Sequence, residues 1–310
     1  MIEVPEAFAR GTVAREGEPG AAWIAELPHL VAELLERWQC VPDGAVLHGG
    51  VGVIVPVRRR GGTPAALKVS FPHPGNVHEP DALELWDGHG AVRLHERADD
   101  RFAMLLERAA GPTLAECGEP DTMMSVAGRL SRRLAVPAPP ELPRLRDRAD
   151  EWETQLRTDE DEFAHPLPSR MVAVAFDTVR DLGRDQPGLL VHGDLHARNI
   201  LRAGREPWLA VDPKGCAGDP AYDAGTVIKA HLLFLLAEDD LDKAVRRSLD
   251  IFTDAAGLDR DRVRRWCQLR AVQTVFWALR YGPGRERPGL DRDGVVALAG
   301  RLAALLTEEV

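Results

Sequence analysis

The sequence predicts an α+β protein with two parts: a small N-terminal part in which an antiparallel sheet lies beside a helix, and a larger C-terminal part that is mostly helical. Two observations support this class. Short runs of β-forming residues between glycine-rich turns occur in the N-terminal part. Beyond them, apolar residues recur every three or four positions in one segment after another, which is the period of an α-helix. We place the boundary after residue 107, so the expected lobes are residues 1–107 and 108–310.

The N-terminal lobe is predicted to begin with an amphipathic helix over residues 21–39, started or interrupted by Pro28. A second helix is predicted over residues 79–86, ending at Gly88. The strands are expected at residues 44–57, 65–69, 90–94 and 102–106. This order of strands, a helix and further strands gives a small α+β lobe.

The C-terminal lobe is predicted to contain helices with one short β interruption. The helices are expected at residues 123–134, 171–182, 223–236, 241–255, 262–280 and 295–306. Two short apolar runs, at 200–202 and 208–211, flank the glycine- and proline-containing segment 203–207, which predicts a β-hairpin.

Composition narrows the class of partner. The chain has 310 residues, of which 49 are acidic and 39 basic, so its formal charge is −10. This sign disfavours nucleic acid, whose binding needs positive charge, and suits an uncharged or cationic small molecule. We therefore predict a small-molecule partner, no nucleic acid, and either a monomer or a homodimer.

Cysteine usage and hydropathy predict a cytoplasmic protein without a membrane partner. The four cysteines form no C-x-x-C pair, which argues against a zinc ribbon or a disulfide framework. Residues 1–20 carry charges throughout, so no secretory signal is expected. The longest apolar run, residues 231–237, is too short to cross a bilayer.

The most informative segment is residues 191–215, which carries Asp194, Asn199 and Asp212 around the predicted hairpin. Phosphoryl transfer needs a carboxylate that orients the attacking hydroxyl and oxygen ligands for magnesium, which neutralises charge on the phosphate. These three residues supply such a set. A hairpin can also bring ligands from its two sides to one ion.

Several motifs resemble the aminoglycoside phosphotransferases, which have a two-lobed protein-kinase-like fold. His192-Gly193-Asp194 stands where kinases carry H-R-D, and Asn199 follows at the matching spacing. The runs 212–215 and 218–223 are similar to the streptomycin 6-phosphotransferase and hydroxyurea phosphotransferase branch. The resemblance implies that Asp194 is the catalytic base, that Asn199 and Asp212 bind Mg²⁺, and that His192 and Asp223 support the catalytic loop.

The N-terminal lobe carries matching nucleotide-binding signals. Residues 64–69 resemble the V-A-I-K strand, in which the lysine, here Lys68, contacts ATP phosphates. Its carboxylate partner is expected to be Glu79, which shares a helix face with Leu83 and Trp86, whereas Glu84 lies on another face and is kept as the alternative. The backbone at Gly50 and Gly52 would cover the phosphates.

The run 104–109 resembles the strand that enters a kinase hinge. Backbone groups of Glu107 and Ala109 would bond adenine there, so their side-chain identity carries little information. ATP and Mg²⁺ are the implied cofactors, and the sequence does not decide between ATP and GTP.

Three alternatives stay open. A zinc hydrolase could use His192, Asp194 and His196, although no second cluster of ligands accompanies them. The chain could also bind a nucleotide without catalysis. Within the kinase reading, the acceptor could be streptomycin or a related aminoglycoside, hydroxyurea, or a choline, homoserine or sugar type of metabolite. The acidic runs 159–162 and 239–242 are candidate contacts for a cationic acceptor, but solvated faces commonly carry such runs.

Overall fold

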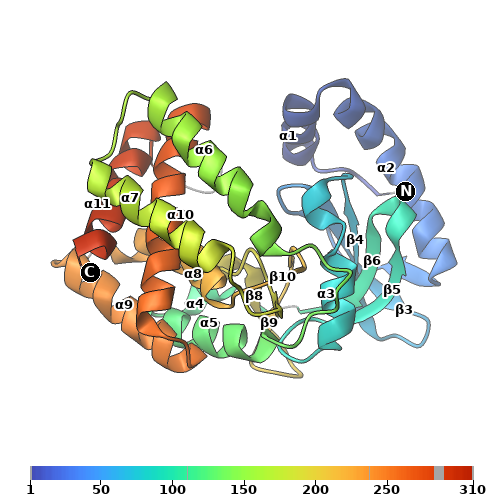
Figure 1. Cartoon of the computed structure of the whole chain (residues 1–310). Coiled ribbons are helices and arrows are strands. Elements are labelled where there is room, and N and C mark those ends of the chain that lie inside the picture. Colours follow the sequence, from blue (N-terminus) through green and yellow to red (C-terminus); the bar gives the residue numbers. More distant parts are fainter. Residues whose placement is uncertain (1, 110, 237, 283–289, 309–310) are drawn as a thin grey trace. The chain divides into compact units, whose positions relative to one another are not determined.

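The computed structural model describes residues 2–109, 111–236, 238–282 and 290–308. The chain forms two compact units (Figure 1): Met1–Gly111 with Arg202–Lys214, and Pro112–Leu201 with Gly215–Val310. Residues 202–214 therefore fold with the N-terminal unit, although they lie far along the chain. The boundary predicted after residue 107 stays a prediction about functional lobes.

The first unit is built on an antiparallel sheet whose strands follow the order β1-β3-β4-β6-β5, with β2 paired to β3. The strands are β1 (Cys40–Pro42), β2 (Leu47–His48), β3 (Gly52–Arg59), β4 (Pro64–Ser70), β5 (Leu94–Ala98) and β6 (Ala103–Glu107). Lys68 on the central strand β4 lies opposite Ile54 of β3 and Met104 of β6. The fold class and the glycine-rich turn between β3 and β4 agree with the sequence prediction.

The strand predicted at 90–94 was wrong, because β5 begins only at Leu94. Ala91 and Val92 are apolar for another reason: they are buried against the segment 208–210. The amide of Val92 donates to the carbonyl of Ala210 at 3.1 Å, and the amide of Ala210 donates to Gly90 at 2.9 Å. An apolar run alone could not distinguish this local bridge from a strand of the main sheet.

One face of the sheet packs against two N-terminal helices, α1 (Glu6–Glu16) and α2 (Glu18–Arg37). Leu27, Val31 and Leu34 of α2 are buried in a core with Val55 of β3 and Leu67 of β4. Pro28 lies inside α2 and does not interrupt it, because this apolar face offsets the lost backbone hydrogen bond. The sequence prediction missed α1, which has almost no amphipathic pattern.

Side chains alternate along β4, so the opposite face carries Lys68 and Ser70. The helix α3 (Glu79–Trp86) has the bounds predicted from its apolar spacing. It contacts β5 and reaches Lys68 through Glu79. The sheet of the first unit therefore has an apolar face, which packs against α1 and α2, and an opposite face where Lys68 meets Glu79 of α3.

The second unit is helical, as predicted, and its helices pack around α10 (Figure 1). α10 contacts α6, α7, α8, α9 and α11. The helices are α4 (Leu114–Cys117), α5 (Pro120–Leu134), α6 (Ala149–Glu162), α7 (Ser169–Thr178), α8 (Ala221–Leu235), α9 (Leu241–Ala256), α10 (Arg260–Tyr281) and α11 (Arg292–Glu308). In the part of the chain that the structure describes, no helix is both long and apolar enough to span a bilayer.

Two short sheets flank the predicted catalytic loop. β7 (Leu189–Val191) pairs antiparallel with β10 (Cys216–Gly218), and the sequence analysis missed both strands. β8 (Ile200–Arg202) and β9 (Trp208–Ala210) pair at the predicted hairpin, and the division between the units falls within β8. Residues 192–199 thus run between two strand ends.

Candidate active site

A buried ion-pair triad lies in the first unit. The ammonium Nζ of Lys68 donates to Oε1 of Glu79 at 2.5 Å and to Oδ1 of Asp212 at 2.6 Å. The side chain of Lys68 is only 9% exposed, and that of Glu79 is 1% exposed. Lys68 comes from β4, Glu79 from the start of α3, and Asp212 from the segment that follows β9. The sequence separation between Lys68 and Asp212 shows that the fold, rather than local pattern, brings this pair together.

The two carboxylates keep Lys68 cationic. Burial alone would lower the pKa of Lys68, but the charges of Glu79 and Asp212 outweigh burial and raise this pKa above its ordinary value. Burial also raises the pKa of Glu79, against the opposing charge of Lys68. A buried cation of this kind can pair with phosphate oxygens in place of one carboxylate.

Asp212 has an unusual backbone conformation. Its φ is +59°, in the left-handed region that residues other than glycine seldom occupy, and Pro213 follows it. The conformation places Oδ1 beside Lys68 and Oδ2 3.6 Å from Nζ of Lys214. A residue in this strained conformation persists only where the surrounding structure holds it, and such residues are more frequent at functional sites than elsewhere.

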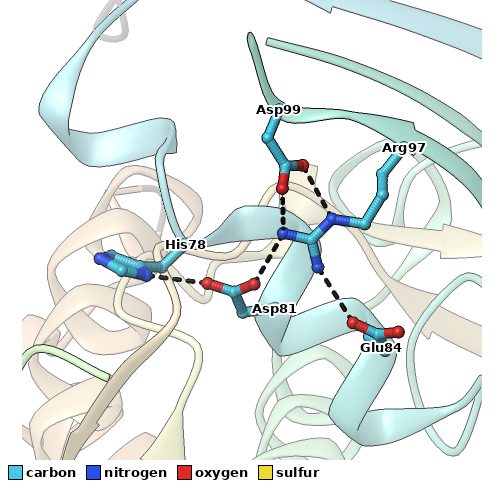
Figure 2. Close-up of polar contacts among 5 residues, drawn as sticks. All are labelled: His78, Asp81, Glu84, Arg97 and Asp99. Carbon is cyan, nitrogen blue, oxygen red and sulfur yellow. Dashed lines mark hydrogen bonds and ion pairs between the residues drawn. The ribbon is translucent and has the colours of Figure 1, made fainter. Parts of the chain in front are cut away.

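The alternative partner of Lys68, Glu84, lies elsewhere. Its side chain is 69% exposed and pairs with Arg97 at 3.0 Å (Figure 2). Arg97 of β5 also donates to Asp81 at 2.8 Å and to Asp99 at 2.7 Å, so it ties α3 to the sheet. The helical face inferred from the sequence therefore separated Glu79 from Glu84 as expected, whereas the Arg97 network was missed.

The predicted glycine-rich segment forms the turn between β2 and β3. A Cβ atom at Gly52 would lie 2.8 Å from Oγ of Ser70 and from the carbonyl of Val69, so the close pairing of β3 with β4 requires glycine there. Gly50 is exposed, and its carbonyl accepts a hydrogen bond from Arg15 of α1 at 2.9 Å. The sequence analysis did not predict this contact between Gly50 and α1.

The predicted hinge residues follow β6. The amide of Glu107 donates to the carbonyl of Arg93 at 2.8 Å, so a backbone contact from Glu107 to a nucleotide must use its carbonyl oxygen. The Glu107 carboxylate pairs with Arg205 at 2.9 Å, and this partner holds its pKa below the ordinary value against the opposing effect of burial. Ala109 is half-buried, and residue 110 lies outside the described residues.

In the second unit, Asp223 holds the loop that carries Asp194. Its Oδ2 accepts from the amide of His192 at 2.9 Å, and its Oδ1 accepts from the amide of Gly193 at 2.8 Å. Burial raises the pKa of Asp223 to about 7, although these two hydrogen bonds oppose the shift. Gly193 has φ +81°, which explains glycine at this position.

The loop itself presents Asp194 with a partly exposed side chain. The amide Nδ2 of Asn199 donates to the carbonyl of Asp194 at 3.0 Å, which commits the nitrogen and leaves Oδ1 as the amide atom suited to a cation. His192 is fully buried, and its Nδ1 accepts from the amide of Asp194 at 3.2 Å. The loop residues singled out from the sequence are thus linked to one another by hydrogen bonds.

A further buried carboxylate, Asp219, was missed. It accepts hydrogen bonds from Nε1 of Trp266 at 2.6 Å and from the amide of Ala221 at 3.0 Å, and it pairs with Arg262. Asp219 therefore fixes the start of α8 against α10, and α8 carries Asp223. The signal in the sequence was the Gly218-Asp219-Pro220 turn directly before a helix.

The zinc alternative is not supported by this geometry. The described residues include no group of three His, Cys, Asp or Glu side chains placed to hold a metal ion. His192 faces the interior, and Nε2 of His196 lies 3.9 Å from Oδ2 of Asp194. The arrangement is that of a braced loop rather than a three-ligand site.

The acidic runs considered for a cationic acceptor have partners within the fold. Asp159 and Glu162 both pair with Arg280 of α10. Asp240 caps α9 through the amide of Lys243, and Asp242 pairs with Arg301. These contacts give the acidic residues structural roles.

Comparison with known proteins agrees with the motifs. The model of the aminoglycoside/hydroxyurea antibiotic resistance kinase family matches residues 37–282. The chain is 38% identical to streptomycin 6-kinase of Streptomyces glaucescens over 93% of this chain and 94% of that protein. It is 34% identical to hydroxyurea phosphotransferase of Kitasatospora aureofaciens over 92% of this chain and 84% of that protein.

The fold is also that of solved kinases. Choline kinase LicA from Streptococcus pneumoniae superimposes with a TM-score of 0.59 at 10% identity, over 92% of this chain and all of that one. At this identity the likeness concerns the fold alone. The match to the family model covers most of the chain, and the two enzymes similar in sequence transfer phosphate to small molecules. The chain belongs to the aminoglycoside/hydroxyurea antibiotic resistance kinases, a family of phosphotransferases.

Proposed function

We propose that this chain transfers the terminal phosphoryl group of ATP to a hydroxyl of streptomycin. Streptomycin is the first choice of acceptor because the relative named streptomycin 6-kinase is 38% identical over almost the whole chain. Hydroxyurea is the second, because the similarity to hydroxyurea phosphotransferase is nearly as high. The observation that carries the transfer chemistry is the buried Lys68 cation held between Glu79 and Asp212.

Lys68 would bind the phosphates of ATP. Its ammonium stays charged because two carboxylates compensate its burial. On nucleotide binding, Lys68 would keep Glu79 and exchange Asp212 for phosphate oxygens. The backbone at Gly50 and Gly52 would cover the phosphates, and Glu107 and Ala109 would offer backbone groups to adenine.

Asp212 and Asn199 would hold Mg²⁺. Magnesium takes oxygen ligands and commonly only one or two from the protein, the rest coming from water and phosphate, so one carboxylate and one amide oxygen fit it. Because Asn199 Nδ2 donates to the Asp194 carbonyl, the other amide atom, Oδ1, would be the ligand of the ion. When bound, the ion would neutralise charge that develops on the phosphate oxygens. The two residues belong to different units, so their meeting at one ion is part of the proposal.

Asp194 would accept the proton of the acceptor hydroxyl as that oxygen attacks phosphorus. The P–O bond to ADP breaks as the new P–O bond forms, so no covalent enzyme intermediate is needed. Asp223 would keep the loop in position through the amides of His192 and Gly193. Positioning and charge neutralisation would thus supply the catalysis.

The acceptor is tested by comparing kcat/KM for streptomycin, a second aminoglycoside, hydroxyurea and choline under saturating ATP. ADP release is followed by a coupled assay, with and without Mg²⁺. The expected result is the highest kcat/KM for streptomycin and no turnover without the ion. A preference for hydroxyurea or choline would overturn the acceptor assignment but keep the kinase. Hydrolysis that needs no nucleotide would overturn both.

We also propose a cytoplasmic location and an assembly no larger than a dimer. ATP is a cytoplasmic substrate, and the four cysteines are free thiols in the structure, so we keep the cytoplasm as the proposed location. A monomer or a homodimer is compatible with these residues, and sedimentation would distinguish them.

A further inference from the structure

Lys214 places a second ammonium at the carboxylate of Asp212. Its Nζ lies 3.6 Å from Oδ2 of Asp212, while Oδ1 of the same carboxylate accepts from Lys68 at 2.6 Å. Asp212 therefore has one lysine beside each of its two oxygens. All three residues belong to the first unit, so one unit contains the whole arrangement.

The two lysines are held with different strength. The side chain of Lys68 is 9% exposed and keeps Glu79 as a second partner at 2.5 Å. The side chain of Lys214 is 31% exposed, and among the described residues Asp212 is the only carboxylate within 4.0 Å of its ammonium. A separation of 3.6 Å is an ion pair without a hydrogen bond. Lys214 is therefore the lysine that can leave Asp212 at the smaller cost.

The surrounding chain restrains the stem of Lys214 and leaves its end accessible. Asp212 has φ +59°, and the ring of Pro213 fixes the φ of the next residue. A Cβ atom at Gly75 would lie 3.9 Å from Cδ of Lys214, so the turn before α3 lies beside the aliphatic stem. The ammonium is thus directed by its neighbours, unlike that of a lysine on a fully solvated loop.

The charges around Asp212 balance only when Lys214 is included. Lys68 and Lys214 supply two positive charges, and Glu79 and Asp212 supply two negative ones. The field of Lys214 reaches Glu79: burial raises the pKa of Glu79, and the charges of Lys68 and Lys214 oppose that rise. Without Lys214, the cluster that is proposed to receive a polyanion would carry a net negative charge, which would repel it.

We propose that Lys214 is a further catalytic residue, which donates hydrogen bonds to oxygens of the terminal phosphoryl group during its transfer. This inference rests on the proposed function. The ion bound by a kinase bridges the β- and γ-phosphates, and its proposed ligand Asp212 is two residues from Lys214. Lys68 would remain with the α- and β-phosphates, as in the V-A-I-K strand.

Lys214 would neither give nor take a proton in the reaction. The proton of the acceptor hydroxyl goes to Asp194, while the new P–O bond forms and the P–O bond to ADP breaks. Lys214 would stabilise the charge on the oxygens of the phosphoryl group as it moves. An interaction that is stronger in the transition state than with bound ATP raises kcat and leaves the affinity for ATP almost unchanged. The two lysines would thus have separable effects.

The proposal is tested by equilibrium titration of ADP and Mg²⁺ into the full chain, with and without aluminium fluoride, which mimics the phosphoryl group in transfer. Lys214→Met removes the ammonium, Lys214→Arg keeps the charge, and Lys243→Met is the control, because Lys243 is an exposed lysine of α9. In the wild type and in Lys243→Met we expect aluminium fluoride to raise the affinity for ADP by at least about tenfold. Lys214→Met should lose most of this gain and keep its affinity for ADP alone, and Lys214→Arg should keep part of the gain.

Steady-state kinetics give a second readout with the acceptor that has the highest kcat/KM. Lys214→Met should lower kcat by about 10²–10³-fold and leave the KM for ATP within about twofold of the wild type. A full gain from aluminium fluoride in Lys214→Met, or none in a wild type that binds ADP, overturns this inference alone. A loss of affinity for ADP itself in Lys214→Met also overturns it, since Lys214 would then act in binding. A wild type that binds neither ADP nor ATP refutes the proposed function.

Discussion

Glu79 in the first unit and Asp223 in the second are both buried carboxylates, but they are compensated in different ways. Glu79 pairs with the ammonium of Lys68, whereas Asp223 accepts two hydrogen bonds from backbone amides. A charge partner can be exchanged for a phosphate, while backbone amides can only fix a loop. The comparison teaches that the buried carboxylate of the first unit balances a charge, whereas the buried carboxylate of the second unit fixes the conformation of a loop.

The largest expected effect concerns the loop that Asp223 holds. Asp194→Asn removes the proposed base while keeping its shape and its backbone contacts. We expect kcat to fall by about 10²–10⁴-fold, the usual contribution of general base catalysis, with little change in the KM for ATP. Steady-state kinetics with streptomycin measure both constants. Full activity would remove Asp194 from the mechanism.

The next effect tests the charge partner of Glu79. Lys68→Met removes the ammonium and leaves two carboxylates facing each other, so we expect a loss of about 3–5 kcal/mol in the free energy of unfolding. Urea denaturation measures it. Lys214→Met is the control, since Lys214 is 31% exposed and lies 3.6 Å from Asp212, and it should cost less than about 1 kcal/mol. Similar losses in both variants would contradict a special role for burial at Lys68.

Asp223→Ala tests the two backbone hydrogen bonds that hold the loop of the second unit. It leaves the amides of His192 and Gly193 without their acceptor, so we expect a loss of about 1–3 kcal/mol in stability and a fall in kcat. ATP binding should persist, because the first unit does not depend on this contact. Asp223→Asn keeps one acceptor oxygen and should lose less. If Asp223→Ala retains the wild-type kcat, the hydrogen bonds to Asp223 are not needed to position the loop.

The pH dependence of stability should report Asp223. Its pKa rises from the ordinary value of 3.8 to about 7 on folding, so the folded state binds more protons than the unfolded state. The stability from this group is therefore complete below pH 3.8 and is lost as pH rises through about 7, at about 1.4 kcal/mol per pH unit between these values. Subtracting the pH profile of Asp223→Asn from that of the wild type isolates the slope. A difference profile that rises with pH would reverse the assignment.

The smallest effect is expected at Glu84. Glu84→Gln removes the most exposed of the three carboxylate partners of Arg97 and should change stability by no more than about 0.5 kcal/mol, without any effect on ATP affinity. The same change at Glu79 should weaken ATP binding. Equal effects at the two positions would mean that the helical face does not decide the partner of Lys68.

Much of the fold could be predicted from local pattern. The spacing of Glu79, Leu83 and Trp86 gave both the bounds of α3 and the carboxylate that reaches Lys68. The loop motif located Asp194 and Asn199 in one hydrogen-bonded segment. The roles of these residues in binding ATP and Mg²⁺ stay predictions.

The missed features depend on contacts between distant residues. α6 was overlooked because a charged residue, Asp159, takes one of its buried positions, and only the fold reveals its partner Arg280. Asp219 and the Arg97 network were missed for the same reason.

The central claim is that Lys68 binds the nucleotide and that Asp194 acts only in the transfer of the phosphoryl group. Equilibrium titration of ATP with Mg²⁺ into Lys68→Met and Asp194→Asn tests it most directly, once circular dichroism shows that both variants are folded. We predict at least about tenfold weaker binding in Lys68→Met, which corresponds to about 1.4 kcal/mol, and wild-type binding in Asp194→Asn. Wild-type affinity in Lys68→Met together with lost affinity in Asp194→Asn would contradict the account.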